Sequence, residues 1–263
     1  MTDRGGELPP GYRLLRYDSL DSTMSEAERL ALAGAGDGTL VLADRQTAGR
    51  GRRGRVWNTP EGNLALSALL RPQVALGRAA LIGFAAGLAL HDSLAPLLKR
   101  PERLRLKWPN DLLLDGAKLA GLLLESRCDA EGRLQWLIVG LGVNLTWAPD
   151  DTPYPAAALR NSVVDLPPPE RLATDWALAF ARWRASFMAA GFAPLRGAWK
   201  ARAAGLGGPL TARLADGTVL EGRFEDIAED GSLLLDIAGE ARARQITAAE
   251  VYFRQGEPHA AGH

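Results

Sequence analysis

The stretch RLRLKWPNDLLLDGAKLAGLLLESRCDAEGRLQWLIVGLGVNL, residues 103–145, carries the strongest indication of the fold. It consists of short apolar or alternating runs between turn formers, which is the pattern of β-strands. The runs are Arg103–Trp108, Leu112–Leu114, Leu119–Ser126 and Leu134–Leu145. Asp115-Gly116 and Glu131-Gly132 are typical hairpin turns, and hairpins join antiparallel strands. We therefore expect a sheet that is antiparallel or mixed.

Helix-like segments alternate with strands before this stretch. Two further strands are predicted at Thr39–Leu42 and Leu64–Leu70, and helices at Thr23–Ala33 and Ala79–Lys99. Thr23 and Glu26 form a T-x-x-E capping box that would open the first helix, and Gly34 would close it. Gly83 and Gly87 lie on one face of the second helix, which favours close packing. The alternation predicts an α/β (α+β) domain.

Three consecutive prolines at positions 167–169 precede a long helical pattern. Trp176, Phe180, Trp183 and Phe187 recur in it at helical spacing. An aromatic stripe of this kind is core more often than it is a ligand cage, so we assign it to the core.

Gly205-Leu-Gly-Gly-Pro209 is the best candidate for a linker. Beyond it, short alternating runs are separated by Asp216-Gly217, Asp230-Gly231 and Gly239, which predicts a small β-barrel. The predicted domains are therefore residues 1–205, with a mixed sheet and helices, and residues 206–263, with the barrel.

The composition excludes several classes of protein. The 263 residues are 47% apolar and 24% charged, which is typical of globular proteins and excludes disordered and fibrous chains. Lys and Arg number 31, as do Asp and Glu, so the chain lacks the positive field of non-specific nucleic-acid binders. One cysteine and no secretory leader predict a reducing compartment, the cytoplasm. Ala79–Leu90 is about half the ~20 residues of a membrane span, so we expect a buried helix there.

The loop Arg45–Arg55, RQTAGRGRRGR, is the most informative stretch for function. It holds five arginines, three glycines and no acidic residue. Glycines let a backbone approach a ligand closely, and guanidinium groups match carboxylate and phosphate oxygens. We interpret it as an anion-binding loop. A flexible solvated loop and a nucleic-acid patch stay open at this point.

Two nucleotide-binding patterns are rejected. Gly49, Gly51 and Gly54 match G-x-G-x-x-G, but that fingerprint must open a helix, and here the chain runs into the turn formers Asn58-Thr-Pro60. The sequence also lacks G-x-x-x-x-G-K-[ST], so we expect no Walker-type ATP site.

Three further clusters combine charged or amide side chains with glycine or proline. Lys107-Trp-Pro-Asn-Asp111 ends a strand at a proline, and Lys118-Leu-Ala-Gly121 follows. Asp111 is suited to orient a cation, a ribose or an amine, and Lys118 to neutralise a phosphate. Taken alone, each is more often a turn residue or a surface charge. Gly140-Leu-Gly-Val-Asn144 is a weaker signal, whose final amide either reads a base edge or caps a turn.

Together these motifs resemble those of the biotin–protein ligases. The resemblance rests on Asp21-Ser-Thr23, Gln46, Gly49–Arg55 with Trp57, and the KWPND, KLAG and GLGVN motifs, in this order and at comparable spacing. It covers residues 17–144 by motif, and the rest of the chain by architecture, since the family carries a small SH3-like C-terminal barrel. The implied fold is a class II synthetase-like α/β catalytic domain with a mixed sheet, plus that barrel.

The resemblance implies an ATP-dependent ligase that works in two steps. Biotin and MgATP give biotinyl-5′-adenylate and pyrophosphate, and the adenylate then biotinylates one lysine of a biotin carboxyl carrier domain of a biotin-dependent carboxylase. ATP and Mg²⁺ are expected as co-substrate, without a tightly bound metal. The chemistry fits, because two anions must meet and arginines, a lysine and Mg²⁺ would screen their repulsion. A mobile glycine-rich loop would also keep water from the mixed anhydride.

The resemblance also implies roles for single residues. Arg52, Lys118 and Asp111 are expected to be catalytic, with Asp111 orienting or deprotonating the incoming lysine. The biotin-binding set is Ser22, Thr23, Gln46, Gly49, Arg50, Arg52, Lys118 and Gly121. The adenylate-binding set is Arg55, Trp57, Lys107 and Asn144, with Lys107 also near the incoming amine. Arg53 is expected to face solvent, and Met24 departs from the polar residue often found after Ser-Thr in relatives.

Several alternatives stay open. Too few residues precede Asp18 for the winged-helix domain of some relatives, so we expect no DNA partner, and no membrane partner either. A lipoate or octanoyl ligase or transferase shares the implied fold, and a non-catalytic biotin sensor would bind without turnover. The barrel is either structural or also contacts the carrier or ATP. A homodimer through an edge strand, with Leu134–Leu145 as the candidate, and a monomer are both compatible with the sequence.

Overall fold

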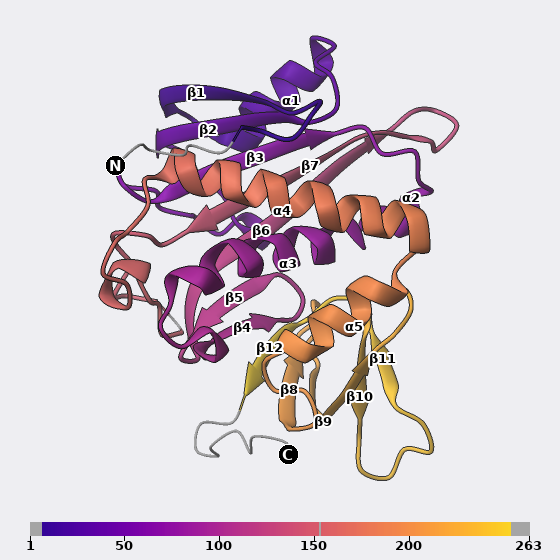
Figure 1. The fold of residues 1–263 in the computed structure, drawn as a ribbon. Coiled ribbons are helices and arrows are strands. Elements are labelled where there is room, and N and C mark those ends of the chain that lie inside the picture. Colours follow the sequence, from indigo (N-terminus) through magenta and orange to yellow (C-terminus); the bar gives the residue numbers. More distant parts are fainter. Residues whose placement is uncertain (1–6, 153, 254–263) are drawn as a thin grey trace.

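The computed structural model describes residues 7–152 and 154–253, which form two β-sheets flanked by helices (Figure 1). The larger sheet has the order β1-β2-β3-β7-β6-β5-β4, and only the β1–β2 pair is parallel. Its strands are β1 (Arg13–Leu20), β2 (Thr39–Gln46), β3 (Leu64–Leu70), β4 (Leu104–Lys107), β5 (Asp111–Leu114), β6 (Ala117–Cys128) and β7 (Leu134–Val143). The expected mixed sheet is confirmed.

Helices cover both faces of this sheet. Helix α1 (Thr23–Leu32) lies on one face, and α3 (Ile82–Leu94) and α4 (Pro169–Ala190) lie on the other (Figure 1). Successive side chains of a strand point to opposite faces. In β2, Val41 therefore packs in the cluster under α1, whereas Leu40 and Leu42 pack in the cluster under α3 and α4.

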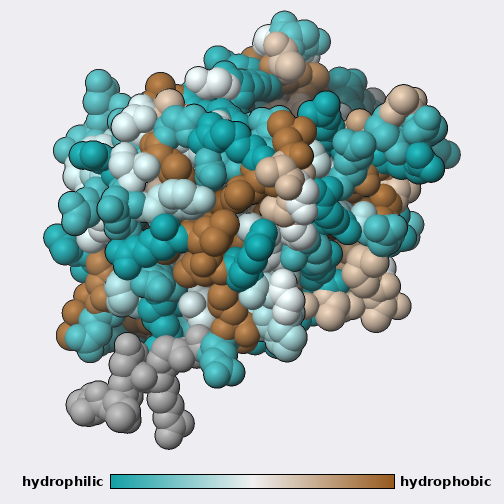
Figure 2. Space-filling view, turned by 90° about the horizontal axis from the view of Figure 1, so that it is seen from above, coloured by the Kyte–Doolittle hydropathy of each residue, from teal (hydrophilic) through white to brown (hydrophobic). Residues whose placement is uncertain are grey.

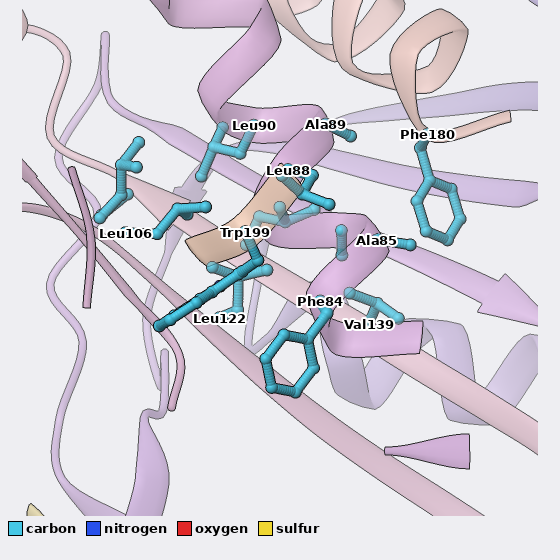
Figure 3. Close-up of a cluster of buried hydrophobic side chains, with 14 of the residues drawn as sticks. Phe84, Ala85, Leu88, Ala89, Leu90, Leu106, Leu122, Val139, Phe180 and Trp199 are labelled. Atoms are coloured by element: carbon cyan, nitrogen blue, oxygen red, sulfur yellow. The ribbon is translucent and has the colours of Figure 1, made fainter. Parts of the chain in front are cut away.

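The main core lies between α3 and the sheet (Figure 3). Phe84 and its neighbours on α3 face Leu122 and Val139 of the central strands. Trp199 closes the cluster, with 5.5 Å between its ring centroid and that of Phe84. Gly83 packs closely here, because a Cβ at this position would lie 3.3 Å from the end of the Leu124 side chain. The close packing expected from this helix face is confirmed.

The aromatic stripe of α4 belongs to the core, as expected. Trp176, Phe180 and Phe187 are each no more than 2% exposed. Trp176 stacks on Phe180 with 4.6 Å between ring centroids. Trp183 is partly buried and donates its indole N–H to Asp92 at 2.9 Å. The stripe thus stabilises the packing of α4 on α3 and the sheet.

The remaining helices are short. They are α2 (Leu76–Ala79) and α5 (Ala193–Arg202), with 3₁₀ turns η1 (Arg52–Gly54), η2 (Ala95–Leu97), η3 (Pro101–Arg103) and η4 (Leu159–Asn161). The single helix expected at Ala79–Lys99 is therefore divided into α2, α3 and η2. Together these span Leu76–Leu97, the one stretch of the described residues long and apolar enough to cross a membrane, and most of it is buried. The burial expected for Ala79–Leu90 is confirmed, although the apolar helical stretch is longer than expected.

A second sheet is formed by residues 209–253. Its strands are β8 (Pro209–Arg213), β9 (Val219–Ile227), β10 (Leu233–Asp236), β11 (Arg244–Ile246) and β12 (Glu250–Phe253), in the order β11-β10-β9-β8-β12. Helix α5 joins it to the rest, because Arg196 and Lys200 both pair with Asp226 of β9, at 2.7 and 2.8 Å. Phe224 of this sheet and Trp199 of α5 belong to one core cluster. The domain boundary expected after residue 205 stays a prediction.

Two local expectations are wrong, and one strand was not predicted. Helix α1 is capped by Ser22 and not by Thr23, because the Ser22 side chain accepts the Met24 N–H at 3.2 Å. Strand β1 is missing from the expected elements, because its side chains are only partly buried and its apolar pattern is weak. Strand β7 lies inside the sheet, so Leu134–Leu145 offers no edge for a second copy, and the edges are β1 and β4.

The surface is mostly polar, as expected for a chain of globular composition. The face seen in Figure 2 is mostly hydrophilic, with a narrow hydrophobic band across it. Most large apolar side chains lie instead in the two buried clusters.

Candidate active site

A cavity of about 1330 Å³ brings together the conspicuous motifs of the sequence. Its lining includes Ser22, Thr23, Gln46, Arg50, Arg52, Arg55, Trp57, Lys107, Asp111, Lys118, Gly121 and Asn144. Of the predicted site residues, Gly49 alone is outside this lining. More basic than acidic residues line the cavity, although the charges of the whole chain balance. The cavity is therefore suited to an anion.

A polar network at the start of α1 forms one end of the cavity. Gln46 Oε1 accepts the Thr23 N–H at 2.8 Å and the Thr23 hydroxyl at 3.2 Å. Gln46 Nε2 donates to Thr59 at 3.0 Å, and Ser67 donates to Thr23 Oγ1 at 2.8 Å. These bonds lock the side chains before a ligand arrives, which is the condition for selective recognition of a polar head group.

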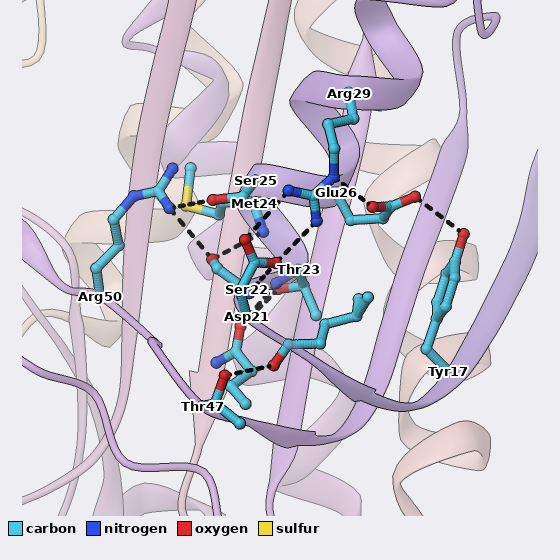
Figure 4. Close-up of polar contacts among 12 residues, drawn as sticks. Tyr17, Asp21, Ser22, Thr23, Met24, Ser25, Glu26, Arg29, Thr47 and Arg50 are labelled. Carbon is cyan, nitrogen blue, oxygen red and sulfur yellow. Dashed lines mark hydrogen bonds and ion pairs between the residues drawn. The ribbon is translucent and has the colours of Figure 1, made fainter.

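Arg50 is anchored beside this network (Figure 4). Its guanidinium donates to the hydroxyls of Ser22 and Ser25, at 3.3 and 2.7 Å, as Figure 4 shows. It also donates to both Glu125 oxygens, at 3.1 and 2.9 Å. The hydrogen bonds with Glu125 raise the pKa of Arg50. Arg50 therefore ties the loop to β6 and α1, and Glu125 already satisfies much of its charge.

The rest of the loop makes a 3₁₀ turn, η1, and not the helix of a dinucleotide-binding fold. Arg53 has φ 58, a left-handed conformation that is uncommon outside glycine. Arg53 and Arg55 both pair with Glu250 of β12. Arg53 is an exposed residue, so the expectation that it faces solvent is confirmed, although its guanidinium also contacts Glu250 at 3.4 Å.

Arg52 differs from the other loop arginines of the cavity. Its guanidinium donates to Asn110 Oδ1 at 3.1 Å, and it forms no ion pair with any residue of the described ranges. Burial lowers the pKa of Arg52, yet an arginine stays charged at neutral pH. A half-buried cation without a carboxylate partner favours binding of an anion.

Strands β4, β5 and β6 place two lysines opposite the loop. The register sets Lys107 beside Asp111 and Asp111 beside Gly121. Lys118 Nζ pairs with Asp111 Oδ1 at 2.7 Å. A Cβ at Gly121 would lie 3.4 Å from the Lys118 side chain, so the small residue leaves room for this pair. The three charged groups therefore form one cluster at the cavity wall.

Lys107 lies against aromatic rings, without an ion pair among the described residues. Its Nζ is 5.3 Å from the Tyr154 ring centroid and 5.8 Å from that of Phe253. Burial lowers the pKa of Lys107. Phe253 belongs to β12, so the C-terminal sheet supplies part of the cavity wall.

Trp57 packs closely against β7. A Cβ at Gly142 would lie 2.2 Å from Trp57 Nε1, so only glycine allows this approach. The indole N–H is buried and finds no acceptor in the described part of the chain. Gly142 therefore fixes the position of the indole ring in the cavity wall.

Asn144 follows β7 in the same wall. It is 3% exposed, and its Nδ2 donates to the Lys118 carbonyl at 3.4 Å. The next residues are held by Asn63, whose Oδ1 accepts the N–H groups of Leu145, Thr146 and Trp147. Asn63 thus fixes the segment that carries Asn144, a role that its place in a turn-forming run does not reveal.

Several further residues of the site escape sequence reasoning. They are Asn110, Glu125, Tyr154, Glu250 and Phe253, which contact the motif residues from other strands and loops. None of them belongs to a spacing pattern that carries chemistry, except Asn110, which is inside the KWPND motif. The run of arginines is an indirect signal for two of them. Cations so close together require carboxylate partners, but the sequence does not show which carboxylates these are.

The donor set of the cavity does not suit a resident metal ion. Within residues 7–152 and 154–253, no three His, Cys, Asp or Glu side chains gather as metal ligands. The carboxylates of Asp111, Glu125 and Glu250 are each paired with a cation of the chain. A divalent ion would therefore need most of its ligands from a bound substrate.

Comparison with known proteins places these residues in one family. Residues 17–144 match the Biotin/lipoate A/B protein ligase family, and residues 205–254 match the Biotin protein ligase C terminal domain. The Biotin--[acetyl-CoA-carboxylase] ligase of Paracoccus denitrificans is 45% identical over 238 residues, which cover 89% of this chain and 97% of that protein. The Bifunctional ligase/repressor BirA of Bacillus subtilis is 34% identical, and the match covers 86% of this chain and 70% of that protein.

A solved structure has the same fold over nearly the whole chain. The biotin protein ligase from Aquifex aeolicus, in complex with biotin and ATP, superimposes with a TM-score of 0.78 at 25% identity. The match covers 92% of this chain and 99% of that one. The expected class of fold, with its small C-terminal sheet, is confirmed.

Asp21 gives the network at the start of α1 a testable pH dependence. Its carboxylate accepts from Arg29 at 2.8 Å and from the Ser22 N–H at 2.7 Å, and the bonds with Arg29 hold its pKa at about 2. We expect Asp21→Asn to lower the free energy of unfolding at pH 7 by up to about 1 kcal/mol, because both partners are half exposed. A depressed pKa stabilises the fold above the unfolded-state pKa, and this contribution is lost as the pH falls towards 2.

Urea unfolding at pH 7, 5 and 3 measures this dependence. The difference between wild type and variant should be constant from pH 7 to 5 and smaller at pH 3. Arg29→Gln is the companion variant: it removes this pair together with the pair of Arg29 and Glu26 at 2.7 Å, so the double variant should lose less stability than the sum of the two single variants. A difference that grows at low pH would contradict the assignment.

Proposed function

The chain belongs to the biotin protein ligase family, and we propose that it joins biotin to one lysine of a biotin carboxyl carrier domain, with ATP as co-substrate. The biotin would be activated as biotinyl-5′-adenylate. The acceptor would be the carrier domain of a biotin-dependent carboxylase. The observation that carries the proposal is the charge arrangement of the cavity, in which Arg52 and Lys107 have no carboxylate partner in the described residues.

In the first step, a carboxylate oxygen of biotin attacks the α-phosphorus of ATP. A new bond joins that oxygen to phosphorus, and the bond from the α-phosphorus to pyrophosphate breaks. Both reactants are anions, so preorganised cations must offset their repulsion where they meet. Arg52 and Lys118 are proposed to hold the carboxylate and the α-phosphate. Arg50 borders the same site, but its pairing with Glu125 gives it the smaller share of the charge.

The head group of biotin is proposed to lie at the α1 end of the cavity. Ser22, Thr23 and Gln46 form the polar network there, and their positions are fixed by hydrogen bonds. Gly121 leaves space in the wall beside Lys118, and Gly49 allows the loop to pass close to Trp57 and Gln46. These glycines therefore act through shape and not through chemistry of their own.

The adenylate is proposed to occupy the wall formed by β7 and the loop. Trp57 would cover the adenine face, and Asn144 would read its edge. Arg55 and Lys107 would contact phosphate oxygens. The close packing of Trp57 on Gly142 supports this arrangement, because it fixes the indole ring in the wall of the cavity.

In the second step, the carrier lysine attacks the acyl carbon of the adenylate. An amide bond forms, and AMP leaves with the electrons of the broken bond. The attacking nitrogen must lose a proton, and Asp111 is proposed to orient the amine and accept it. Lys118, at 2.7 Å from Asp111, holds that carboxylate in place.

The proposal extends to the metal ion, the cellular compartment and the partners of the chain. Mg²⁺ is proposed to enter with ATP, because the cavity offers no set of protein ligands for it in the described residues. The half-buried Cys128 has no disulfide partner, and the single cysteine of the chain fits a reducing compartment, for which we propose the cytoplasm. Binding of DNA or of a membrane is not part of the proposal. Self-association, if it occurs, would use the edge strand β1 or β4.

Exchange of labelled pyrophosphate into ATP tests the first step. We expect exchange that depends on biotin and is not supported by lipoate or octanoate, since the polar network is preformed for a polar head group. Exchange with lipoate alone would assign the chain to the other branch of the family. Biotin binding without any exchange would identify a sensor and contradict the enzyme.

Lys118→Ala tests the proposed cation of the first step. We expect biotin-dependent exchange to fall by roughly two powers of ten or more, the scale of losing one preorganised charge donor. Lys99→Ala is the matched control, because Lys99 is an exposed lysine outside the cavity lining. Near-normal exchange by Lys118→Ala would remove Lys118 from the mechanism.

A further inference from the structure

Strand β12 of the C-terminal sheet brings one acidic side chain to the arginine loop. Glu250 Oε1 pairs with Arg53 Nη1 at 3.4 Å and also with Arg55 Nη2. The Glu250 side chain is 18% exposed, whereas that of Arg55 is 57% exposed. One largely buried carboxylate therefore pairs with two more exposed guanidinium groups, although 195 positions separate Arg55 from Glu250.

Two tyrosine hydroxyls fix this carboxylate from its other side. Tyr154 donates to Tyr252 Oη at 2.6 Å, and Tyr252 donates to Glu250 Oε2 at 3.1 Å. Glu250 and Tyr252 of β12 both line the cavity, and Val251 between them is buried. Since both Glu250 oxygens are engaged, the carboxylate cannot turn from the loop without losing a hydrogen bond.

The loop conformation depends on this contact. Arg53 has φ 58 and Gly54 has φ 72, so two consecutive residues are left-handed. A non-glycine residue keeps such a conformation only where surrounding contacts hold it. Glu250 supplies one of those contacts. The conformation of the loop and the position of β12 are therefore coupled.

Building on the proposed function, we infer that Glu250 is a positioning residue of the polyphosphate site. Its carboxylate takes the place of a phosphate oxygen on Arg53 and Arg55 while nucleotide is absent. ATP, with its greater negative charge, displaces it from these guanidinium groups. Glu250 then competes with pyrophosphate after cleavage and favours its release. The C-terminal sheet thereby sets how tightly the site holds polyphosphate.

Glu250 should affect the binding of polyphosphate and not that of the biotin carboxylate. Arg52, proposed for the biotin carboxylate, is not paired with Glu250, whereas Arg53 and Arg55 are. Neutralising Glu250 should therefore tighten binding of pyrophosphate and ATP but leave binding of biotin unchanged. A residue that only supported the fold would weaken both.

The experiment compares wild type with Glu250→Gln, Glu250→Asp and Asp226→Asn in biotin-dependent exchange, with pyrophosphate as the varied probe. Asp226 is the matched control, because it ties α5 to the same sheet through two ion pairs and lies outside the cavity lining. We expect Glu250→Gln to lower the KM for pyrophosphate about three- to tenfold at about 50 mM salt, with the biotin KM unchanged. The difference should shrink at about 500 mM salt. Glu250→Asp and Asp226→Asn should stay near wild type.

An unchanged or raised pyrophosphate KM in Glu250→Gln would overturn the inference, as would an equal drop in Asp226→Asn. Tyr252→Phe gives an opposite test, since it frees Glu250 Oε2 and leaves the charge in place. Its pyrophosphate KM should not fall below that of wild type, and a fall like that of Glu250→Gln would overturn the inference. Calorimetric binding of pyrophosphate reads the same competition without turnover. A wild-type chain without exchange contradicts the proposed ligase, whereas unchanged pyrophosphate binding in Glu250→Gln contradicts only the role inferred for Glu250.

Discussion

The repulsion between cations that share one small cavity is the constraint on which the site depends. At an effective dielectric constant of about 20, two like charges 4 Å apart repel by about 4 kcal/mol. The chain offsets this cost with its own carboxylates. Glu125 pairs with Arg50, and Asp111 pairs with Lys118. Glu250 pairs with both Arg53 and Arg55. The arginines can therefore stay close together before any anionic substrate binds.

This pairing also divides the work among the cations. Arg50 is anchored by two carboxylate oxygens and two hydroxyls, which suits a fixed wall. Arg52 and Lys107 have no ion pair in the described residues, so they offer the strongest attraction to a new anion. Arg53 and Arg55 share one carboxylate and can exchange it for phosphate. Arginines that look alike in the sequence thus have different roles: Arg50 is a fixed part of the cavity wall, Arg52 is free to bind substrate, and Arg53 and Arg55 can exchange Glu250 for phosphate.

Local pattern was enough to predict much of the fold. Strand β3 agrees with the expected Leu64–Leu70 to the residue, and the aromatic stripe of α4 is buried as its spacing indicates. The failures concern features that local pattern does not carry. Strand β1 is half exposed, so its periodicity is weak. The place of β7 in the middle of the sheet depends on pairing with β3 and β6, which no local signal reveals.

The same limit applies to the site. The motifs predicted the residues that now line one cavity, because each motif is short and its chemistry is local. Their carboxylate partners come from elsewhere, and Glu250 lies 195 positions from Arg55. Only the folded chain shows which arginine is paired with which carboxylate. For this reason the sequence left the role of the C-terminal sheet open. The contact of Glu250 with Arg53 and Arg55 shows how this sheet reaches the arginine loop.

A crystal structure of the chain with biotin and a non-hydrolysable ATP analogue would show directly whether the arginine loop binds both anions. We expect the Arg52 guanidinium to lie about 3 Å from an oxygen of the biotin carboxylate or of the α-phosphate, within hydrogen-bond reach. A structure in which residues 49–55 point away from both ligands would contradict it.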